Sequence, residues 1–386
     1  MSEINSSNFK KEHGDLAPDL VGVTELTSPY FFVPPSGTTA ERPEDCEPGT
    51  LRFNTDIGSL EIFRGNTIGW ESIQRRTGQY LGNTLGDPST ANGSTAGLGV
   101  RGVYGGASGP SNNNLNTLDF ITISTLGDAQ DFGDAIGNYI WTGCCSSHVR
   151  GLLMNGYNNQ NQIQFLTFSS QGDTVDFGDT TQARHQGTSI SNKIRGIAVA
   201  GTHPAAYNIM DYVTISQTGN AVDFGDVATA GTFHGTSASP TRGIIAGANV
   251  PSSVNVIQFI TFATTGDAQD FGDLITAKGG ARGCSNATRA VHRGDGNTLE
   301  FITIATLGNA IDFGDMTAEQ AQTNTCSSSV RGVFPGRSDP SGGSYATNHI
   351  EFITFATTGN AQDFGDATDD FSSYQGFMST GHGGIG

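Results

Sequence analysis

One phrase constrains this chain more than any other feature. It is "FITISTLGDAQDFGD", which begins at Phe120, and variants of it begin at Phe165, Tyr212, Phe259, Phe301 and Phe352. In every copy the opening aromatic stands 12 residues before the Phe of "FGD", as from Phe120 to Phe132. A phrase that recurs at fixed internal spacing is typical of a chain built from equivalent supersecondary units.

All of the length variation between copies is confined to one segment. The Phe of "FGD" is followed after 18 residues by an Arg in five copies and by His382 in the last, while Arg101 precedes the first. From Arg to the next opening aromatic, the spacing is 19, 15, 17, 17, 12 and 21 residues. We therefore expect one variable connection per unit, on one face of a regular scaffold, and we expect function on that face.

The local pattern within a unit is that of β-strands. "LDFITIS" alternates at period two, and "TLGD" or "TTGN" supplies turn residues. The chain has 54 Gly and only 15% charged residues, which favours short strands over helices. From Phe120 to Phe165 is 45 residues, the size of a propeller blade, and the "RGxxxGG" strand resembles that of kelch blades, without their Tyr and Trp.

These patterns predict an all-β fold, a β-propeller of six kelch-like blades. The terminal "SYQGFMSTGHGGIG" matches the start of a unit, so we expect the C-terminal strand to close the ring. Seven blades is the alternative if "GQYLGNTLGD", residues 78–87, is a degenerate copy. A β-solenoid is the second alternative, although its rungs normally repeat at half this length.

Charged residues recur with the phrase, and we interpret them as scaffold. Six arginines are predicted to form structural pairs with six aspartates or to have those aspartates cap backbone N–H groups. These are Arg101, Arg150, Arg195, Arg242, Arg289 and Arg331, with Asp134, Asp179, Asp226, Asp273, Asp315 and Asp366. Calcium bound by the same carboxylates is the alternative. Because an active site is normally unique and the histidines share no repeat position, we expect no catalytic residue and no cofactor.

Composition and cysteine usage exclude several classes of protein. Cys145, Cys284 and Cys326 each stand 13 residues after the Phe of "FGD", and we expect them to be small buried hydrophobic residues. A net charge of −18 argues against nucleic-acid binding. The sequence contains no apolar window of 18 residues and starts without the apolar core of a signal peptide, so we expect no membrane insertion.

The variable connections carry the candidate surface-binding residues. They are rich in Asn, Ser and Tyr, which suit hydrogen bonding and stacking to sugars or to another protein. The candidates are Asn114, Tyr157, Asn158, Tyr207, Ser253, Tyr345 and His349. Trp141 stands in a segment of constant length, where it either packs between units or serves as a contact platform.

The chain before Arg101 lacks the repeat. We predict an extended arm over residues 1–46, a β-hairpin module over 47–76, a linker over 77–97 and the repeat domain over 98–386. In the module, "TLRFNT" and "SLEIFR" flank a turn, and "GWESI" supplies a third strand.

The module has a pattern that resembles a known family. "GTLRFNT…GSLE…G…W", from Gly49 to Trp70, is similar to a module near the amino terminus of tailed-phage virion proteins, especially tail fibres. The "FITIATTGNAQDFGD…RG" type of repeat resembles one in structural proteins of cyanophages and other marine phages. The resemblance implies a virion protein made in the host cytoplasm, present as a homo-oligomer, and attached to other virion proteins through Arg52, Phe53, Asn54 and Trp70.

Two roles follow from that resemblance. In the first, the repeat domain is an adhesin of the tail-fibre type that binds a host surface glycan or protein. In the second, the chain is a purely structural capsid decoration, fibre connector or tail adaptor. An enzyme that trims host polysaccharide is a distant third hypothesis.

Overall fold

The computed structural model describes residues 34–43, 46–56, 59–65, 69–73, 100–105, 116–137, 141–156, 160–249, 251–294, 296–317, 325–335, 347–371 and 376–385. The chain divides into two compact units, Met1–Thr77 and Gly78–Gly386. Nearly all regular structure in the described ranges is β-strand. No helix in those ranges has the length and apolar character that crossing a bilayer requires. The expected all-β fold class is confirmed.

In the first unit, the described residues form one four-stranded sheet in the order β1-β2-β3-β4. Its elements are β1 (Ser36–Gly37), the 3-10 helix η1 (Thr39–Glu41), β2 (Leu51–Asn54), β3 (Ser59–Phe63) and β4 (Trp70–Ile73). The predicted hairpin and third strand are present. The predicted boundary at residue 46 is wrong, because β1 pairs in parallel with β2 and therefore belongs to the sheet.

The described residues of the second unit form six four-stranded antiparallel sheets. We number their strands first to fourth in sheet order. Sheet 1 has β28 (Gly376–Ser379), β5 (Arg101–Gly105), β6 (Thr117–Thr122) and β7 (Gln130–Asp134); sheet 2 has β8 (Gly143–Ser146), β9 (Arg150–Gly156), β10 (Gln160–Thr167) and β11 (Val175–Asp179); sheet 3 has β12 (Thr188–Ser191), β13 (Arg195–Thr202), β14 (Ala206–Thr214) and β15 (Val222–Asp226).

The remaining three sheets repeat the same plan. Sheet 4 has β16 (Gly235–Ala238), β17 (Arg242–Asn249), β18 (Ser253–Thr261) and β19 (Gln269–Asp273); sheet 5 has β20 (Gly283–Ser285), β21 (Arg289–Arg293), β22 (Thr298–Thr303) and β23 (Ile311–Asp315); sheet 6 has β24 (Cys326–Ser327), β25 (Arg331–Pro335), β26 (Thr347–Thr354) and β27 (Gln362–Phe371). The repeated phrase forms the third strand, a tight turn and the fourth strand of each sheet.

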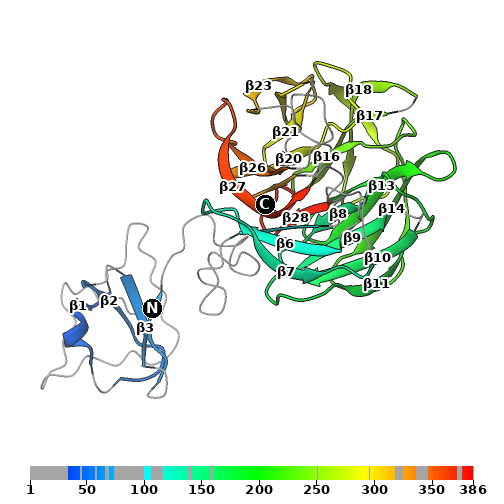
Figure 1. Ribbon diagram of the computed structural model, residues 1–386. Coiled ribbons are helices and arrows are strands. Elements are labelled where there is room, and N and C mark those ends of the chain that lie inside the picture. The colour runs from blue at the N-terminus through cyan, green and yellow to red at the C-terminus, as the bar shows by residue number, and fades with distance from the viewer. Residues whose placement is uncertain are drawn as a thin grey trace, which may run out of the picture. The chain divides into compact units, whose positions relative to one another are not determined.

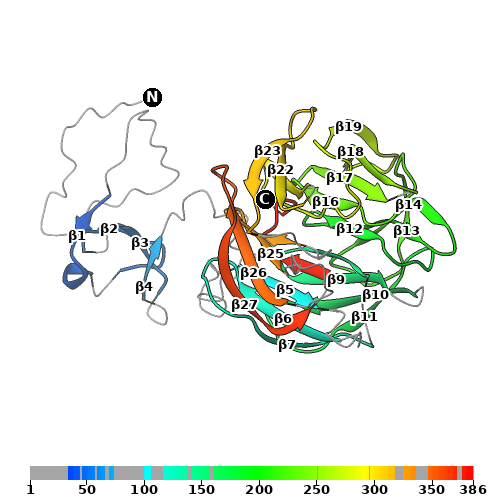
Figure 2. The ribbon, with the colours of Figure 1, turned by 45° about the horizontal axis from the view of Figure 1, so that its top comes forward.

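The C-terminal strand completes the sheet that the start of the repeats begins. β28 pairs antiparallel with β5, from Gly376 opposite Gly105 to Ser379 opposite Gly102. The first strands also contact one another in the order β8, β12, β16, β20, β24, β28, and β28 contacts β8. Figure 1 shows β28 (red) beside β8, and Figure 2 shows β26 and β27 of sheet 6 beside β6 and β7 of sheet 1.

The constant spacings within the six copies of the phrase place two aromatic rings and one guanidinium together in each sheet. Phe120 and Phe132 meet edge to face with ring centroids 6.1 Å apart, and the Arg101 guanidinium lies 4.5 Å from the Phe120 centroid. The other five sheets repeat both contacts, with ring centroids 5.8–6.2 Å apart and a guanidinium over the opening aromatic. The 12-residue spacing is therefore the spacing of an aromatic pair across a hairpin.

Backbone hydrogen bonds join each "FGD" to the turn of the following sheet. Gly172 N donates to Phe132 O and Thr174 N donates to Asp134 O, both at 2.8 Å, while Asp134 N donates to Asp173 Oδ1 at 3.0 Å. Equivalent bonds occur at all six junctions, and the last joins sheet 6 to sheet 1, where Asp366 N donates to Asp128 Oδ1. The turn residue, Asp or Asn, thus caps a backbone N–H group of its neighbour.

Both glycines of the phrase are explained by this junction. A Cβ on Gly225 would lie 2.5 Å from the carbonyl carbon and oxygen of Gly266 in the next turn, and the φ of Gly225 is +139°. Gly266 has a φ of +148°, but a Cβ there would meet no atom within 4 Å. The first glycine is required by close approach as well as by φ, and the second by φ alone.

The glycine of the "RG" dipeptide receives a side chain from the preceding sheet. A Cβ on Gly102 would lie 2.7 Å from Cys326 Sγ, and one on Gly196 would lie 2.9 Å from Cys145 Sγ. Sheet 5 has Ala290 in place of this glycine, and the residue of sheet 4 that is equivalent to Cys145 is the small Ser237. The repeat cysteines are buried, as predicted, because each fills a glycine socket.

A buried polar residue just before the opening aromatic holds the connection that enters its sheet. The six are Asp119, Gln164, Asp211, Gln258, Glu300 and Glu351. Gln164 Oε1 accepts from Ile136 N at 2.9 Å, and Gln258 Oε1 accepts from Ala228 N at 2.7 Å. Asp211 accepts from Thr181 and also pairs at 2.8 Å with Arg184, which is fully buried. Sequence reasoning did not identify these six residues.

Glu300 provides a test of this arrangement. Burial raises its pKa, although hydrogen bonds from Ile275 N and Thr276 oppose the shift. A raised carboxyl pKa contributes stability below the unfolded pKa and loses it as pH rises through the folded pKa. Sheets 2 and 4 have Gln at this position. At pH 7 we therefore expect the free energy of unfolding of E300Q to equal that of the wild type or to exceed it by up to about 1 kcal/mol.

Urea unfolding of wild type, E300Q and E300A at pH 4 and pH 7 measures the effect. E300A serves as the control, because it leaves the Ile275 N–H group without its acceptor and should cost about 1–3 kcal/mol at both pH values. Equal losses of stability in E300Q and E300A at pH 7 would contradict the interchangeable role of Gln and Glu.

Candidate functional site

The predicted pairing of repeat arginines with repeat aspartates is wrong. Each arginine donates from Nη1 to a carbonyl three residues after the opening aromatic of the following sheet, as Arg195 does to Phe262 O at 2.6 Å. The same bond recurs for Arg101, Arg150, Arg242, Arg289 and Arg331, the last returning to Ile123 of sheet 1. A guanidinium held on an aromatic face and a carbonyl needs no carboxylate.

By its spacing in the sequence, His382 stands where the other units have their arginine, but in the structure it does not take an arginine's place. The first residue of β5, Arg101, occupies the sixth arginine position, because it stacks on Phe120 as the other arginines stack on their aromatics. His382 lies beyond β28 instead. The 18-residue offset to His382 is correct in sequence, but β28 replaces only the first strand of its sheet and the second comes from the start of the repeats.

The repeat aspartates lie in the fourth strands, away from those arginines. Asp134, Asp179, Asp226, Asp273, Asp315 and Asp366 are half-buried or exposed, and their backbone N–H groups, not their carboxylates, make the bonds between sheets. In the described ranges, no group of three or more His, Cys, Asp or Glu side chains is arranged to hold a metal ion. The calcium alternative therefore gains no support from this geometry.

The variable connections all leave the same end of their sheets. In an antiparallel sheet, the connection between the second and third strands lies at the end where the first strand begins. The six sheets are oriented alike, because residues at equivalent positions of neighbouring first strands contact one another, as Ser146 and Ser191 do. We call this end the variable end and the other the turn end.

Three of the predicted surface-binding residues lie in the described ranges. Tyr207 is half-buried, and its hydroxyl donates to His203 O. Ser253 Oγ accepts from Gly279 N at 3.0 Å, and His349 lies 3.3 Å from Glu351 Oε1 and 3.5 Å from Asp363 Oδ1. Each therefore has a structural partner as well as exposure. Asn114, Tyr157, Asn158 and Tyr345 lie outside the described residues, as do residues 78–87 of the seven-blade alternative.

The predicted attachment residues are mostly internal to the first unit. Arg52 and Asn54 are buried, and both face Glu61, which is fully buried: Asn54 Nδ2 donates to Glu61 Oε1 at 3.1 Å, and Arg52 Nε lies 3.7 Å from the same oxygen. Arg42 pairs with the other oxygen of Glu61 at 2.6 Å. These polar and charged groups are partners of one another inside the module, so the expectation that Arg52 and Asn54 form its attachment surface is not supported. Phe53 and Trp70 are half-buried.

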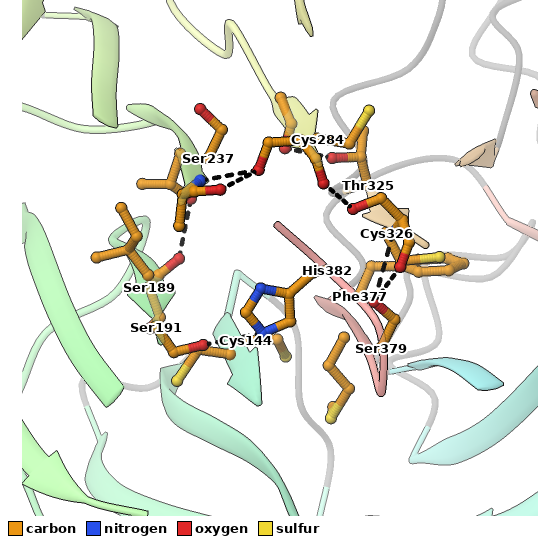
Figure 3. Close-up of a pocket in the computed structure, with 18 of the residues that line it drawn as sticks. Cys144, Ser189, Ser191, Ser237, Cys284, Thr325, Cys326, Phe377, Ser379 and His382 are labelled. Atoms are coloured by element: carbon orange, nitrogen blue, oxygen red, sulfur yellow. Dashed lines mark hydrogen bonds between the residues drawn. The ribbon is translucent and has the colours of Figure 1, made fainter. Parts of the chain in front are cut away.

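A cavity of about 70 Å³ lies where the six first strands meet. Because roughly 10–15 Å³ is enough to hold one water molecule, this space is large enough for more than one. Figure 3 shows Ser189, Ser191, Ser237, Thr325 and Ser379 around this space. The lining residues include four cysteines, whose thiol pKa values are raised by burial. Such thiols are inert rather than nucleophilic.

Seryl hydroxyls join neighbouring first strands around the cavity. Ser191 Oγ accepts from Ser146 N at 3.0 Å and donates to Ser146 O at 2.8 Å. One hydroxyl thus satisfies both backbone groups of a residue on the open edge of the adjacent strand. Ser146, Ser285, Ser327 and Ser379 act in the same way on the preceding sheet. The sixth position is Ala238, which has no hydroxyl group to hydrogen-bond with the backbone of Ser191. A recurrent Ser four residues before the repeat Arg was a sequence signal for this belt.

The C-terminal residues cover the belt at the turn end. His382 Nε2 lies 2.8 Å from Ser146 O and 3.3 Å from Ser191 Oγ, beside the position where Ala238 interrupts the belt. Gly383 N donates to Ser285 O at 2.9 Å, and a Cβ on Gly383 would collide with the carbonyl oxygens of Ala238 and Asn286. The tail therefore closes this end of the cavity, and Figure 3 shows His382 beside Ser191 and Cys144.

A buried Ser–His pair lies beside the cavity. Ser237 Oγ is 3.0 Å from His292 Nε2, and His292 Nδ1 is 3.0 Å from Ala281 O. The carbonyl requires the proton on Nδ1, so Nε2 accepts from the serine. Burial lowers the His292 pKa to about 4. A carbonyl in the place of a carboxylate and an imidazole that is a weak base make this pair a packing element rather than a catalytic dyad.

Trp141 packs between two sheets. Its φ is +59°, and its half-buried ring stacks on His185 of the next connection with centroids 5.3 Å apart. Gln186 N donates to Trp141 O at 3.3 Å. Of the two roles considered for Trp141, the structure supports packing between units.

Comparisons with known proteins add no family to this description. A search with models of protein families found no match, and a search of curated proteins likewise found none.

Proposed function

We propose that the second unit is a six-bladed β-propeller and that the chain is a non-enzymatic virion protein of a tailed phage, anchored by its first unit. Three features support the propeller: six equivalent four-stranded sheets, the pairing of β28 with β5, and junction bonds that return from sheet 6 to sheet 1. The phage assignment is supported by the resemblance of the "LRFNT" module and of the repeats.

In this proposal the propeller binds the host surface with its variable end. One observation carries this role: the contacts that recur in every sheet belong to the scaffold, within one sheet or between neighbours, while all of the length differences lie in the connections at one end. The described part of that end presents polar and aromatic side chains such as Tyr207 and Ser253. A rigid scaffold that presents loops of different sequence on one side is suited to the recognition of a ligand.

Binding of the labelled full chain to host bacteria and to a panel of bacterial surface polysaccharides tests this role. One connection between second and third strands is replaced by that of sheet 5, the shortest in the chain. The variant should lose at least about tenfold in affinity, with unchanged unfolding, because it lacks loop contacts but keeps its junctions. No binding of the wild type to any host surface would contradict the adhesin role.

A structural connector is the second candidate, and one observation favours it. Apolar side chains project from the turn end: Leu126, Val149, Ile194, Leu307 and Val330 are 51–60% exposed. A ring of this kind suits stacking on a flat neighbour. A double variant with L126T and L307T separates the roles, since threonine already occupies sister turns. It should reduce incorporation into particles if the turn end docks, and leave host binding unchanged if the variable end is the adhesive face.

A further inference from the structure

The residues after β28 cover the turn end of the cavity and are held there mainly by backbone groups. Thr380 N donates to Arg101 O at 3.0 Å, and Thr380 Oγ1 accepts from Arg101 N at 3.1 Å. Gly383 N donates to Ser285 O of sheet 5. Gly383 and Gly384 fit against carbonyl groups only because they lack a Cβ, and Ile385 supplies a buried apolar side chain. We call residues 380–385 the plug.

His382 is the one titratable side chain in the plug, and both of its ring nitrogens have partners. Nε2 lies 2.8 Å from Ser146 O, and Gly384 N donates to Nδ1 at 3.1 Å. A carbonyl accepts only from a protonated nitrogen, so Nε2 carries the proton and Nδ1 carries none. The contacts therefore select the neutral imidazole. Protonation of Nδ1 would replace the acceptor of the Gly384 N–H group with a second donor.

Within the described residues, no carboxylate compensates a charge on His382. No Asp or Glu is among the residues that line the cavity. His148, in the turn between β8 and β9, places Nδ1 3.2 Å from Thr380 O. The titratable and charged groups on the elements around the plug are the four cavity thiols, His148, Arg101, Arg282 and the exposed Lys193. An imidazolium here would meet only neutral or positive groups.

We propose that the plug is an acid-sensitive gate: protonation of His382 releases residues 380–385 from the turn end and opens the cavity, while the six sheets remain folded. β28 keeps its pairing with β5, because those bonds run from Gly376 to Ser379 and do not involve the imidazole. The plug has no other polar side chain that bonds across the cavity, so the loss of the His382 bonds removes its main polar attachment to sheet 2.

The gate has a defined response to pH. Burial lowers the pKa of the closed His382 to about 4, the bond to Ser146 O opposes this shift, and the charge of His148 adds to it. In the released plug the imidazole returns to its ordinary pKa of 6.5. The closed plug is therefore stable above pH 6.5, and this stability is lost as the pH falls toward 4. Between pH 7.5 and pH 5, the ratio of open to closed plug should rise about thirtyfold.

Labelling of the cavity thiols with a pyridyl disulfide tests the gate in the full chain. A buried thiol reacts only when it becomes exposed, so the labelling rate of Cys144, which Figure 3 shows beside His382, reports the opening. Peptide mass spectrometry identifies the labelled cysteine. Each rate is divided by that of the unfolded chain at the same pH, which removes the intrinsic pH dependence of the reaction. We expect the corrected rate to be about thirtyfold higher at pH 5 than at pH 7.5.

Urea separates the gate from unfolding of the whole domain. A local opening exposes little surface, so its rate should not change with urea at concentrations below the unfolding transition. Labelling that accelerates with urea as steeply as global unfolding would overturn the proposal, because the thiols would then be exposed only when the sheets unfold. An unchanged rate between pH 7.5 and pH 5 would overturn it as well.

Variants at the two histidines identify the titrating group. Gln can donate to Ser146 O and accept from Gly384 N without titrating, so H382Q should show a rise of less than about threefold. H382A lacks both bonds and should label at least about tenfold faster than wild type already at pH 7.5. H148Q is the matched control, because His148 contacts the plug from outside, and it should keep a rise of at least about tenfold.

The comparison of H382Q with H148Q decides the outcome if H382A does not fold. A pH response that persists in H382Q at the size seen in wild type would overturn the assignment of the gate to His382. Loss of the response in H148Q with its retention in H382Q would do the same, since the titrating group would then be His148.

Discussion

Lowering the pH from 7 to 4.5 should remove most of the stability of the repeat domain. Burial lowers the pKa of His234, His292 and His382 to about 4 from an ordinary 6.5. The unfolded chain takes up these three protons below pH 6.5, and the folded chain does so only near pH 4. Each histidine thus contributes stability above pH 6.5 that is lost as pH falls toward 4, about 3 kcal/mol each. The sum, about 10 kcal/mol, matches the whole stability of a typical domain.

Urea unfolding of the full chain at half-unit steps from pH 7.5 to 4.5 measures this loss. The free energy of unfolding should fall by about 4 kcal/mol per pH unit once the unfolded histidines are protonated, which corresponds to three protons. H382Q should reduce that slope by about a third, whereas H203Q, at an exposed histidine, should not change it. A free energy of unfolding that stays constant between pH 7 and 5 would refute the neutral, buried state of these imidazoles.

Replacing Gly225, the "FGD" glycine of sheet 3, with alanine should destabilise the domain far more than the same change at Gly266, in the adjoining turn of sheet 4. In G225A, the new Cβ would lie 2.5 Å from the carbonyl of Gly266, and it would also meet the φ of +139°. In G266A the Cβ enters open space, so only the φ of +148° opposes it. We expect about 1–2 kcal/mol for G266A and about 3–5 kcal/mol for G225A.

The pair of variants isolates the contact between sheets, because both positions have similar φ values and differ in what surrounds the Cβ. Chemical denaturation of both proteins at pH 7.5 gives the two free energies of unfolding. If the two variants lost equal stability, backbone conformation alone would explain the glycine, and the close approach of the two sheets would not be needed.

The sequence predicted the sheets well because their determinants are local. Strict offsets between Phe120, Phe132 and Arg101 encode an aromatic pair with a guanidinium over it, and the terminal "SYQGFMSTGHGGIG" matched the start of a unit that the first repeat completes. The confinement of length differences to one segment predicted a single variable face.

The partners of the charged residues could not be predicted in the same way. An Arg and an Asp at constant spacing suggest a pair, but spacing along the chain does not show which sheet each side chain faces. Arg195 contacts Tyr212 of its own sheet and a carbonyl of the next, whereas the true ion pair in this region joins Arg184 to Asp211, neither of them part of the predicted set.

The cavity was missed for a related reason. Its lining lies outside the repeated phrase, in the segment between "FGD" and the Arg, where the length is constant but most residues differ. The signal was a Ser four residues before the repeat Arg, which recurs at Ser146, Ser191, Ser285 and Ser327.

An experimental density map of the full chain, at a resolution that shows side chains, tests the central claim most directly. The account expects six sheets related by rotation about one axis, β28 paired with β5, and Asp128 of sheet 1 bonded to the backbone N–H of Asp366 in sheet 6. A map in which sheets 1 and 6 do not touch, or in which residues 376–385 pair elsewhere, would contradict it.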